Sequence, residues 1–359
     1  MKFAKTLAVL LIGPFVGGVL SVYASEVPQA KTTSTLDLLP SSPTAQGAPT
    51  TSMSVTFLSE TSIAVGLCQR LSDSVCELSV IRWENGVLRV IARTHSFGPT
   101  QMEIHPSTGG RILTTPIGKL PATLYSEDLS LEQELVPLHH VSQSGATVAE
   151  LNPGGWKLYR LASKLEPLRE GTGELQAVSE GVVVIRDGDL LRTETLQGKP
   201  VASFSLRPAS KCYSSVALVG DSLYLSDCKG ARIVDFSGRE QLRVRPPRGW
   251  GQRPTSSDNG KRLLFHHLDR KISAVRSVGE DVLAIATLGL GVAEEQANRE
   301  EIRVVDTTNG NSCFDWKRGD DLSENAASIS PSGEFVAIGS AGGLSVYRLP
   351  AVCETKTTK

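Results

Sequence analysis

The chain has 359 residues and nearly balanced charge, with 37 lysines and arginines against 38 aspartates and glutamates. A net charge of -1 provides no general basic field, which excludes a protein that binds nucleic acid or a membrane surface through its overall charge. Hydrophobic residues make up 40% of the sequence, enough for a sizeable core, and the 33 glycines and 19 prolines are typical of a fold with many tight turns.

Residues 1–24 have the features of a secretory signal peptide. Lys2 and Lys5 precede an apolar run over residues 7–20, and small residues suited to cleavage precede Ser25. The run is short and is interrupted by glycine and proline, which argues against an uncleaved membrane span of about 20 apolar residues. We therefore predict an exported protein, periplasmic or extracellular, that is not inserted in the membrane after cleavage.

Residues 25–52 are rich in Ser, Thr, Pro and Ala and contain few large apolar side chains. Such a segment buries too little surface to offset the entropy lost on ordering. It is predicted to be a flexible leader, followed by a single domain over residues 53–354 and a disordered tail over residues 355–359.

Seven segments of that domain share a turn-strand-turn-strand pattern. The third strand of each is expected near Val80, Leu124, Leu158, Leu191, Ile233, Val304 and Val346. Five of the six gaps between these positions lie between about 33 and 44 residues. A period of about 40 residues with four short strands per unit predicts an all-β fold, a β-propeller of seven blades, each with four antiparallel strands.

The remaining gap, of about 71 residues, contains the segment 268–300, which we interpret as an insertion in blade six. The strand-like run at residues 282–287 keeps an eighth blade open as an alternative. The overlapping stretch 288–301 has two of the glycines of a phosphate-binding loop, but it lacks the third glycine, the Lys-Ser/Thr pair and the following βα unit. A long loop on a propeller face favours partner binding or a cap instead.

Two turns and one strand carry a family resemblance. Residues 330–333 (SPSG) and 257–261 (SDNGK) resemble the SPDG-type strand turns of WD-repeat and YVTN-type bacterial propellers, and residues 302–310 (IRVVDTTNG) are similar to the WD strand. The resemblance covers roughly residues 54–353 and implies a scaffold fold, with little about activity. The sequence departs from WD repeats in having no Gly-His dipeptide, so their usual buried hydrogen-bond network should be absent.

Propellers of this family usually close their ring by pairing the two chain ends. Within the leader, residues 36–39 have the apolar character needed to dock as the outer strand of the last blade. The resemblance therefore implies that this short segment closes the ring.

The cysteines indicate disulfide bonds. There are six, and an exported chain meets an oxidising environment. Cys68 and Cys76 lie symmetrically about a central residue, and Cys212 and Cys228 lie symmetrically about Gly220. Because hairpin strands place such positions opposite each other, within the Cα separation that a disulfide needs, we predict both bonds.

Cys313 and Cys353 are then left to each other, in a bond that would tie the penultimate unit to the chain end. A cysteine-based metal site is disfavoured because the sequence has no Cys-x-x-Cys and its histidines are not spaced with its cysteines.

Residues 243–254 gather arginines around a tryptophan in a Pro- and Gly-containing loop between two predicted blades. The candidate ligand-binding residues are Arg243, Arg245, Arg248, Trp250 and Arg253. Arginines beside an exposed Trp bind carboxylates, sulfated or phosphorylated sugars, or an acidic protein surface. The alternative is a solvated connection whose Trp covers the edge of a blade.

Two adjacent histidine pairs, His139-His140 and His266-His267, are the other obvious candidates. Neighbouring residues of a strand point to opposite faces, so each pair offers at most one ring to any site. A channel metal site built from one histidine of each pair and a carboxylate is the less favoured interpretation. We predict no metal ligand and no cofactor.

The sequence contains no set of residues that we can assign to catalysis. A Gly-x-Ser-x-Gly elbow is missing, and no two strand or turn acids can be paired as general acid and base. The favoured function is a non-catalytic, monomeric binding or scaffold module for a protein or a cell-envelope glycan. The alternative is a propeller enzyme, lactonase-like or a metal-assisted hydrolase, which requires acids or histidines from several blades to converge at one end of the central channel.

Overall fold

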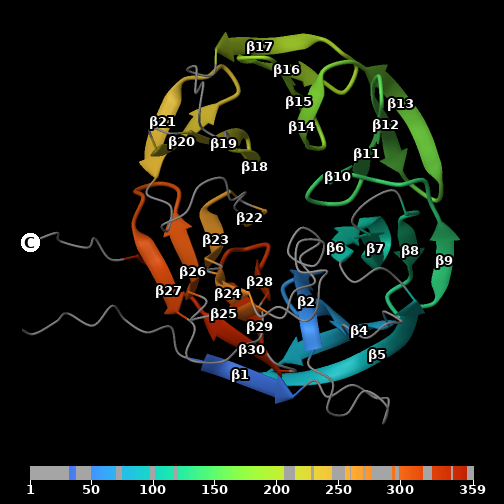
Figure 1. The fold of residues 1–359 in the computed structure, drawn as a ribbon, viewed down its shortest axis with the longest axis vertical. Helices are drawn as coiled ribbons and strands as arrows, with labels where there is room; N and C mark the ends of the chain where they lie inside the picture. Colours follow the sequence, from blue (N-terminus) through green and yellow to red (C-terminus); the bar gives the residue numbers. More distant parts are fainter. Residues whose placement is uncertain are drawn as a thin grey trace, which may run out of the picture.

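The computed structural model describes residues 32–37, 50–69, 75–97, 102–116, 120–205, 215–227, 230–244, 255–258, 260–269, 272–275, 293–295, 299–317, 326–340 and 343–353. They form an all-β propeller of seven four-stranded antiparallel sheets, the blades, arranged in a ring (Figure 1). The first strand of each blade lies nearest the ring axis and the fourth lies outermost (Figure 1). The predicted signal peptide lies outside the described residues.

The first three blades follow one another along the chain. Blade one contains β2 (Thr50–Phe57), β3 (Ser62–Gln69), β4 (Val75–Glu84) and β5 (Val87–Phe97). Blade two contains β6 (Met102–Ser107), a short 3-10 turn (Thr108–Gly110), β7 (Arg111–Pro116), β8 (Thr123–Tyr125) and β9 (Leu131–Glu134). Blade three contains β10 (His140–Val141), β11 (Thr147–Asn152), β12 (Gly155–Leu161) and β13 (Leu165–Gly171).

The next two blades repeat this order. Blade four contains β14 (Glu174–Val178), β15 (Val182–Asp187), β16 (Leu190–Thr195) and β17 (Pro200–Ser205). Blade five contains β18 (Ser215–Val219), β19 (Ser222–Asp227), β20 (Gly230–Asp235) and β21 (Glu240–Val244).

The last two blades depart from simple chain order. Blade six contains β22 (Thr255–Ser256), β23 (Arg262–Asp269), β26 (Arg299–Asp306) and β27 (Ser312–Lys317). Blade seven contains β28 (Ala326–Ile329), β29 (Phe335–Ser340), β30 (Gly343–Arg348) and, as its outer strand, β1 (Thr32–Asp37).

The predicted repeat is confirmed strand by strand. Each of the seven expected third-strand positions falls in the third strand of its blade, and all seven side chains are buried: Val80, Leu124, Leu158, Leu191, Ile233, Val304 and Val346. A third strand is flanked by neighbours on both sides and covered on both faces, which explains the near-continuous apolar pattern that made these strands recognisable.

The prediction that the leader docks on the last blade is also confirmed. Strand β1 pairs antiparallel with β30, and Leu36 lies opposite Leu344. The strand covers Thr32–Asp37, so it begins earlier than the segment 36–39 singled out in the sequence. Pairing of an N-terminal strand with a C-terminal hairpin closes the ring.

Between β23 and β26 the chain forms β24 (Ile272–Val275) and β25 (Ala293–Glu295), which pair only with each other. Since β23 and β26 are hydrogen-bonded neighbours within blade six, this pair adds no blade, and the ring has seven. Residues 270–271, 276–292 and 296–298 lie outside the described residues, and the insertion over 268–300 stays a prediction.

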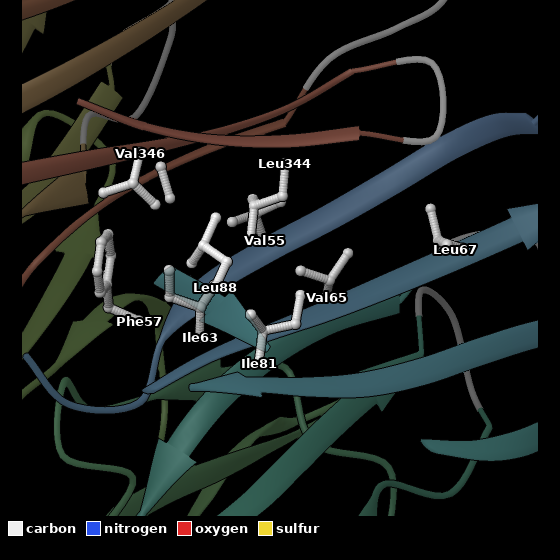
Figure 2. Packing of buried hydrophobic residues seen from close by; sticks show 10 residues of the cluster. Val55, Phe57, Ile63, Val65, Leu67, Ile81, Leu88, Leu344 and Val346 are labelled. Atoms are coloured by element: carbon white, nitrogen blue, oxygen red, sulfur yellow. The ribbon is translucent and has the colours of Figure 1, made fainter. Parts of the chain in front are cut away.

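The core consists of seven apolar clusters, one at each junction between adjacent blades. Figure 2 shows the junction of blades one and seven, where Val55, Ile63 and Ile81 pack against Leu344 and Val346. Strand residues point alternately to the two faces, so each blade contributes one set of side chains to each neighbour. Leu158 of blade three, for example, packs in a cluster with Leu175 and Val183 of blade four.

Of the three predicted disulfides, the one whose two side chains are both described is present. Cys313 of β27 is bonded to Cys353, which follows β30, with Cα atoms 4.6 Å apart. Cys68 and Cys76 lie directly opposite each other in the β3–β4 register, as the hairpin prediction requires. Cys212 and Cys228 lie outside the described residues, so that disulfide stays a prediction.

None of the described residues belongs to a helix with the length and apolar character needed to cross a membrane.

Replacing Leu158 tests whether the blade junctions carry the stability of the fold. Leu158 is fully buried, and we expect Leu158→Ala to lower the free energy of unfolding by about 2–5 kcal/mol, because it leaves a cavity between two blades. The matched control is Leu131→Ala, since Leu131 on outer strand β9 is 60% exposed. Urea denaturation followed by circular dichroism measures both, and equal losses would contradict this account.

Candidate binding site

The predicted arginine-rich loop, residues 243–254, is described only at its beginning. Arg243 is exposed on β21, and its Nε donates to Glu240 over 2.7 Å. This hydrogen bond raises the pKa of the Arg243 guanidinium. The other four candidates, Arg245, Arg248, Trp250 and Arg253, lie outside the described residues, in the connection between β21 and β22.

Only the first of the two histidine pairs has described side chains. His139 is exposed, and its Nδ1 accepts a hydrogen bond from the backbone N–H of Leu151, while His140 begins β10. His266 and His267 belong to β23, and their side chains are outside the described set. His105, which the sequence did not single out, is enclosed enough that desolvation lowers its pKa to about 4.

A third cluster resembles a metal site by proximity alone. Within the described part of the chain, Asp306, Cys313 and Cys353 place potential ligand atoms within 4.8 Å of one another. The two sulfurs are bonded to each other, and the guanidinium of Arg262 contacts both. A disulfide offers no thiolate, and an arginine occupies the space beside it, so this cluster does not have the donors that zinc requires.

At one end of the ring, the turns between the first and second strands of the blades meet; we call them the inner turns. They connect β2–β3, β6–β7, β10–β11, β14–β15, β18–β19, β22–β23 and β28–β29. Gly145, in the inner turn of blade three, lies tightly against the end of β6 in blade two: a Cβ added there would lie 2.1 Å from the carbonyl oxygen of Pro106.

Carboxylates from three blades lie among these inner turns. Glu60 of blade one accepts hydrogen bonds from the backbone N–H and hydroxyl of Ser332 in blade seven. Glu180 of blade four accepts from the N–H and hydroxyl of Ser144 in blade three, at 3.0 and 2.6 Å. Each of these two acids therefore holds the inner turn of a neighbouring blade.

The third carboxylate, Asp258 of blade six, forms a hydrogen bond with a blade that is not its neighbour. Its Oδ1 accepts from Nε2 of Gln143 in blade three over 2.8 Å, and its backbone N–H donates to the carbonyl of Pro331 over 2.9 Å. Desolvation, followed by repulsion from Glu60 and Glu180, raises the pKa of Asp258, and the Gln143 hydrogen bond only partly opposes this shift. Acids from several blades do converge at one end of the ring.

A pocket of about 540 Å³ lies beside this region, between blades six and seven. Its rim carries Lys261, Thr308, Glu334 and Arg348, all exposed side chains from the ends of strands and from turns. Ser332, Gly333, Leu349, Pro350 and Ala351 complete the wall, and Arg262 and Asp306 line it from below.

The base of the pocket is held by a buried arginine. Nη1 of Arg262 pairs with Asp306 over 2.9 Å, and Nη2 donates to the carbonyl oxygens of Pro350 and Ala351, each over 3.3 Å. The disulfide to Cys353 anchors the same segment to blade six. The wall that follows β30 is therefore fixed in place, and the pocket is preformed.

The pocket and Arg243, at the start of the arginine-rich loop, both lie beside one turn of blade six. Asp306 and Thr308, in the β26–β27 turn, line the pocket. At the other end of that turn, a Cβ added to Gly310 would lie 3.5 Å from the carbonyl oxygen of Arg243. The β26–β27 turn therefore lies against the pocket at one end and against the backbone of Arg243 at the other.

Sequence reasoning identified the two turns beside the pocket, 257–261 and 330–333, but not the pocket itself. The available signal was that Lys261 and Arg348 occupy strand ends in adjacent units, which a propeller places side by side. Arg262 gave no signal, because a charged residue at the start of a strand is ordinarily exposed.

No protein-family model matches this chain. No curated protein sequence matches it either.

Solved structures do show the same architecture. A chain in the crystal structure of a mitotic checkpoint complex aligns with a TM-score of 0.51 at 12% identity, covering 98% of this chain and 99% of that one. The structure of streptogramin B lyase aligns with a TM-score of 0.52 at 12% identity, covering 88% and 97%. At this identity the likeness shows the fold, and the fold does not determine the activity.

Replacing Asp258 tests the electrostatics of the inner turns. A carboxyl whose pKa is raised on folding destabilises the native state when ionised, at pH values above the folded pKa, and this penalty disappears below the unfolded value of about 3.8. We expect Asp258→Asn to raise Tm at pH 7 by about 1–3 °C, and the gain should vanish as the pH falls to about 3.8. Calorimetric scans across this range measure the effect.

The control is Asp189→Asn, because Asp189 is exposed in the β15–β16 turn at the opposite end of blade four. A pH-independent gain in the Asp258 variant, or an equal pH-dependent gain in the control, would rule out the electrostatic explanation.

Proposed function

We propose that this chain is an exported, non-catalytic, monomeric propeller that binds a protein or a cell-envelope glycan. The observation that carries the proposal is the preformed 540 Å³ pocket between blades six and seven, which shares the β26–β27 turn with the start of the arginine-rich loop at Arg243. Its size falls within the range of about 300–1,000 Å³ that is typical of ligand pockets. It combines charged rim residues with a wall fixed by Arg262 and a disulfide.

The structural neighbours support a binding role without deciding it. One neighbour belongs to a mitotic checkpoint complex, so that propeller works within a protein assembly. The other is a lyase, so the same architecture also supports catalysis. Residues Arg245, Arg248, Trp250 and Arg253 stay proposed contacts of the binding surface, together with the predicted insertion at 268–300.

The alternative of an enzyme with its site at the ring axis has one observation in its favour. Glu60, Glu180 and Asp258 reach the same end of the ring, and Asp258 has a raised pKa. The binding proposal explains these contacts as the means by which neighbouring inner turns hold each other. Metal analysis of the purified protein separates the two, since one tightly held metal ion per chain would favour the metal-assisted enzyme.

Export is supported by the residues of the N-terminal segment and by the Cys313–Cys353 disulfide, since disulfides persist in oxidising compartments. We expect the mature protein to begin at Ser25. Peptide mapping without reduction should recover Cys68–Cys76, Cys212–Cys228 and Cys313–Cys353 as linked pairs. Intact mass and thiol counting measure both features; retention of residues 1–24 or any free thiol would contradict export with three disulfides.

Binding is tested with envelope fractions separated into protein and polysaccharide. We expect saturable binding of the purified protein to one fraction, weakened about tenfold or more by Trp250→Ala, because aromatic residues at the centre of an interface contribute disproportionately. The control Arg89→Gln, on outer strand β5 of blade one, should bind like the wild type. Absence of saturable binding to either fraction would overturn the proposal.

A further inference from the structure

The charges of the pocket between blades six and seven select a type of ligand. Three basic residues, Lys261, Arg262 and Arg348, line it together with two acidic residues, Asp306 and Glu334. Arg262 and Asp306 form an ion pair at the base, and Arg262 is only 10% exposed, so these two charges largely neutralise each other. The rim therefore presents the cationic side chains of Lys261 and Arg348 together with the Glu334 carboxylate.

The two rim cations come from different blades. Lys261 immediately precedes β23 of blade six, whereas Arg348 is the last residue of β30 in blade seven. The guanidinium of Arg348 lies 6.0 Å from the ring centroid of Phe335, a cation–π contact that leaves its N–H groups available to a ligand. A planar carboxylate between the two cations would accept bidentate hydrogen bonds from the guanidinium.

The other lining residues suit a ligand rich in hydroxyl groups. The Glu334 carboxylate accepts hydrogen bonds from hydroxyls, and the Thr308 hydroxyl, which donates to Asp306, can accept one as well. Leu349 and Pro350 provide an apolar wall for the C–H face of a sugar ring. Glu334 would repel a doubly charged phosphate more strongly than a singly charged carboxylate.

We propose that this pocket binds an acidic sugar, a uronate unit of a glycan, with its carboxylate between Lys261 and Arg348 and its hydroxyls at Glu334 and Thr308. The inference rests on the proposed binding function and names its ligand class. The Arg262–Asp306 pair and the disulfide shape the pocket from beneath without contacting the sugar.

The experiment is isothermal titration of the full mature protein with methyl β-D-glucuronide. Methyl β-D-glucoside serves as the uncharged counterpart, and inorganic phosphate serves as an anion without a sugar. A ligand of this size that uses its contacts efficiently has a Kd of about 1 mM. We expect that value for the glucuronide, and binding at least tenfold weaker for the glucoside and for phosphate.

Variants locate the site. Arg348→Gln and Lys261→Gln should each weaken glucuronide binding by about tenfold or more, because each removes a charge-assisted hydrogen bond. Arg89→Gln, also an exposed arginine on a strand, should leave the Kd unchanged. Equal affinity for the glucoside or phosphate, or an unchanged Kd in both pocket variants, would overturn the assignment.

The outcome is separable from that of the proposed function. If the glucuronide does not bind while the protein still binds an envelope fraction saturably, the acidic-sugar assignment is wrong and the binding module stands. If neither binds, both proposals fail.

Discussion

Apolar contact between neighbouring blades is the constraint on which the rest of this structure depends. A four-stranded sheet with apolar side chains on both faces cannot bury them alone, and here each blade buries them against two neighbours in seven separate clusters. Both faces of every blade are covered only if the ring closes. Blade seven closes the ring. Its outer strand β1 comes from the N-terminal segment, and the chain that follows β30 is bonded through Cys353 to blade six. Both ends of the described chain are therefore structural parts of the ring.

Tight blade packing also explains the acids at the ring axis. When seven blades converge, their inner turns come within van der Waals contact, and the polar groups of those turns must find partners in one another. Glu60 with Ser332 and Glu180 with Ser144 satisfy that requirement between adjacent blades. Gln143 and Asp258 do so between blades three and six, at the cost of a raised pKa for the aspartate. Convergence of acids, the feature that an enzyme would need, is therefore also what a closely packed ring produces without catalysis.

The same geometry explains which features could be predicted from the sequence and which could not. A repeat of about 40 residues reveals which strand is third in each blade, because that strand is covered on both faces, and all seven expected positions proved correct. Symmetric cysteines likewise revealed that Cys68 and Cys76 are opposite each other, since a hairpin fixes its own register. The repeat pattern describes each unit separately, however, and it does not predict which side chains of neighbouring units lie close together. Lys261 and Arg348 belong to different units, and only the closed ring brings them to one pocket.

Ring closure and the candidate binding site share residues, which determines what mutations can separate them. The segment from Leu349 to Cys353 leaves blade seven, passes over Arg262 and is bonded to blade six, so it seals the junction of these blades and forms the pocket wall. Arg262 is buried beside Asp306 and the disulfide, and removing it would leave the Asp306 carboxylate in the same junction without its cation. Loss of binding in such a variant would reflect a weakened ring as much as a lost contact. Arg348 is exposed at the rim with its guanidinium over the ring of Phe335, so it can be changed without opening the junction, and its side chain therefore distinguishes recognition from stability.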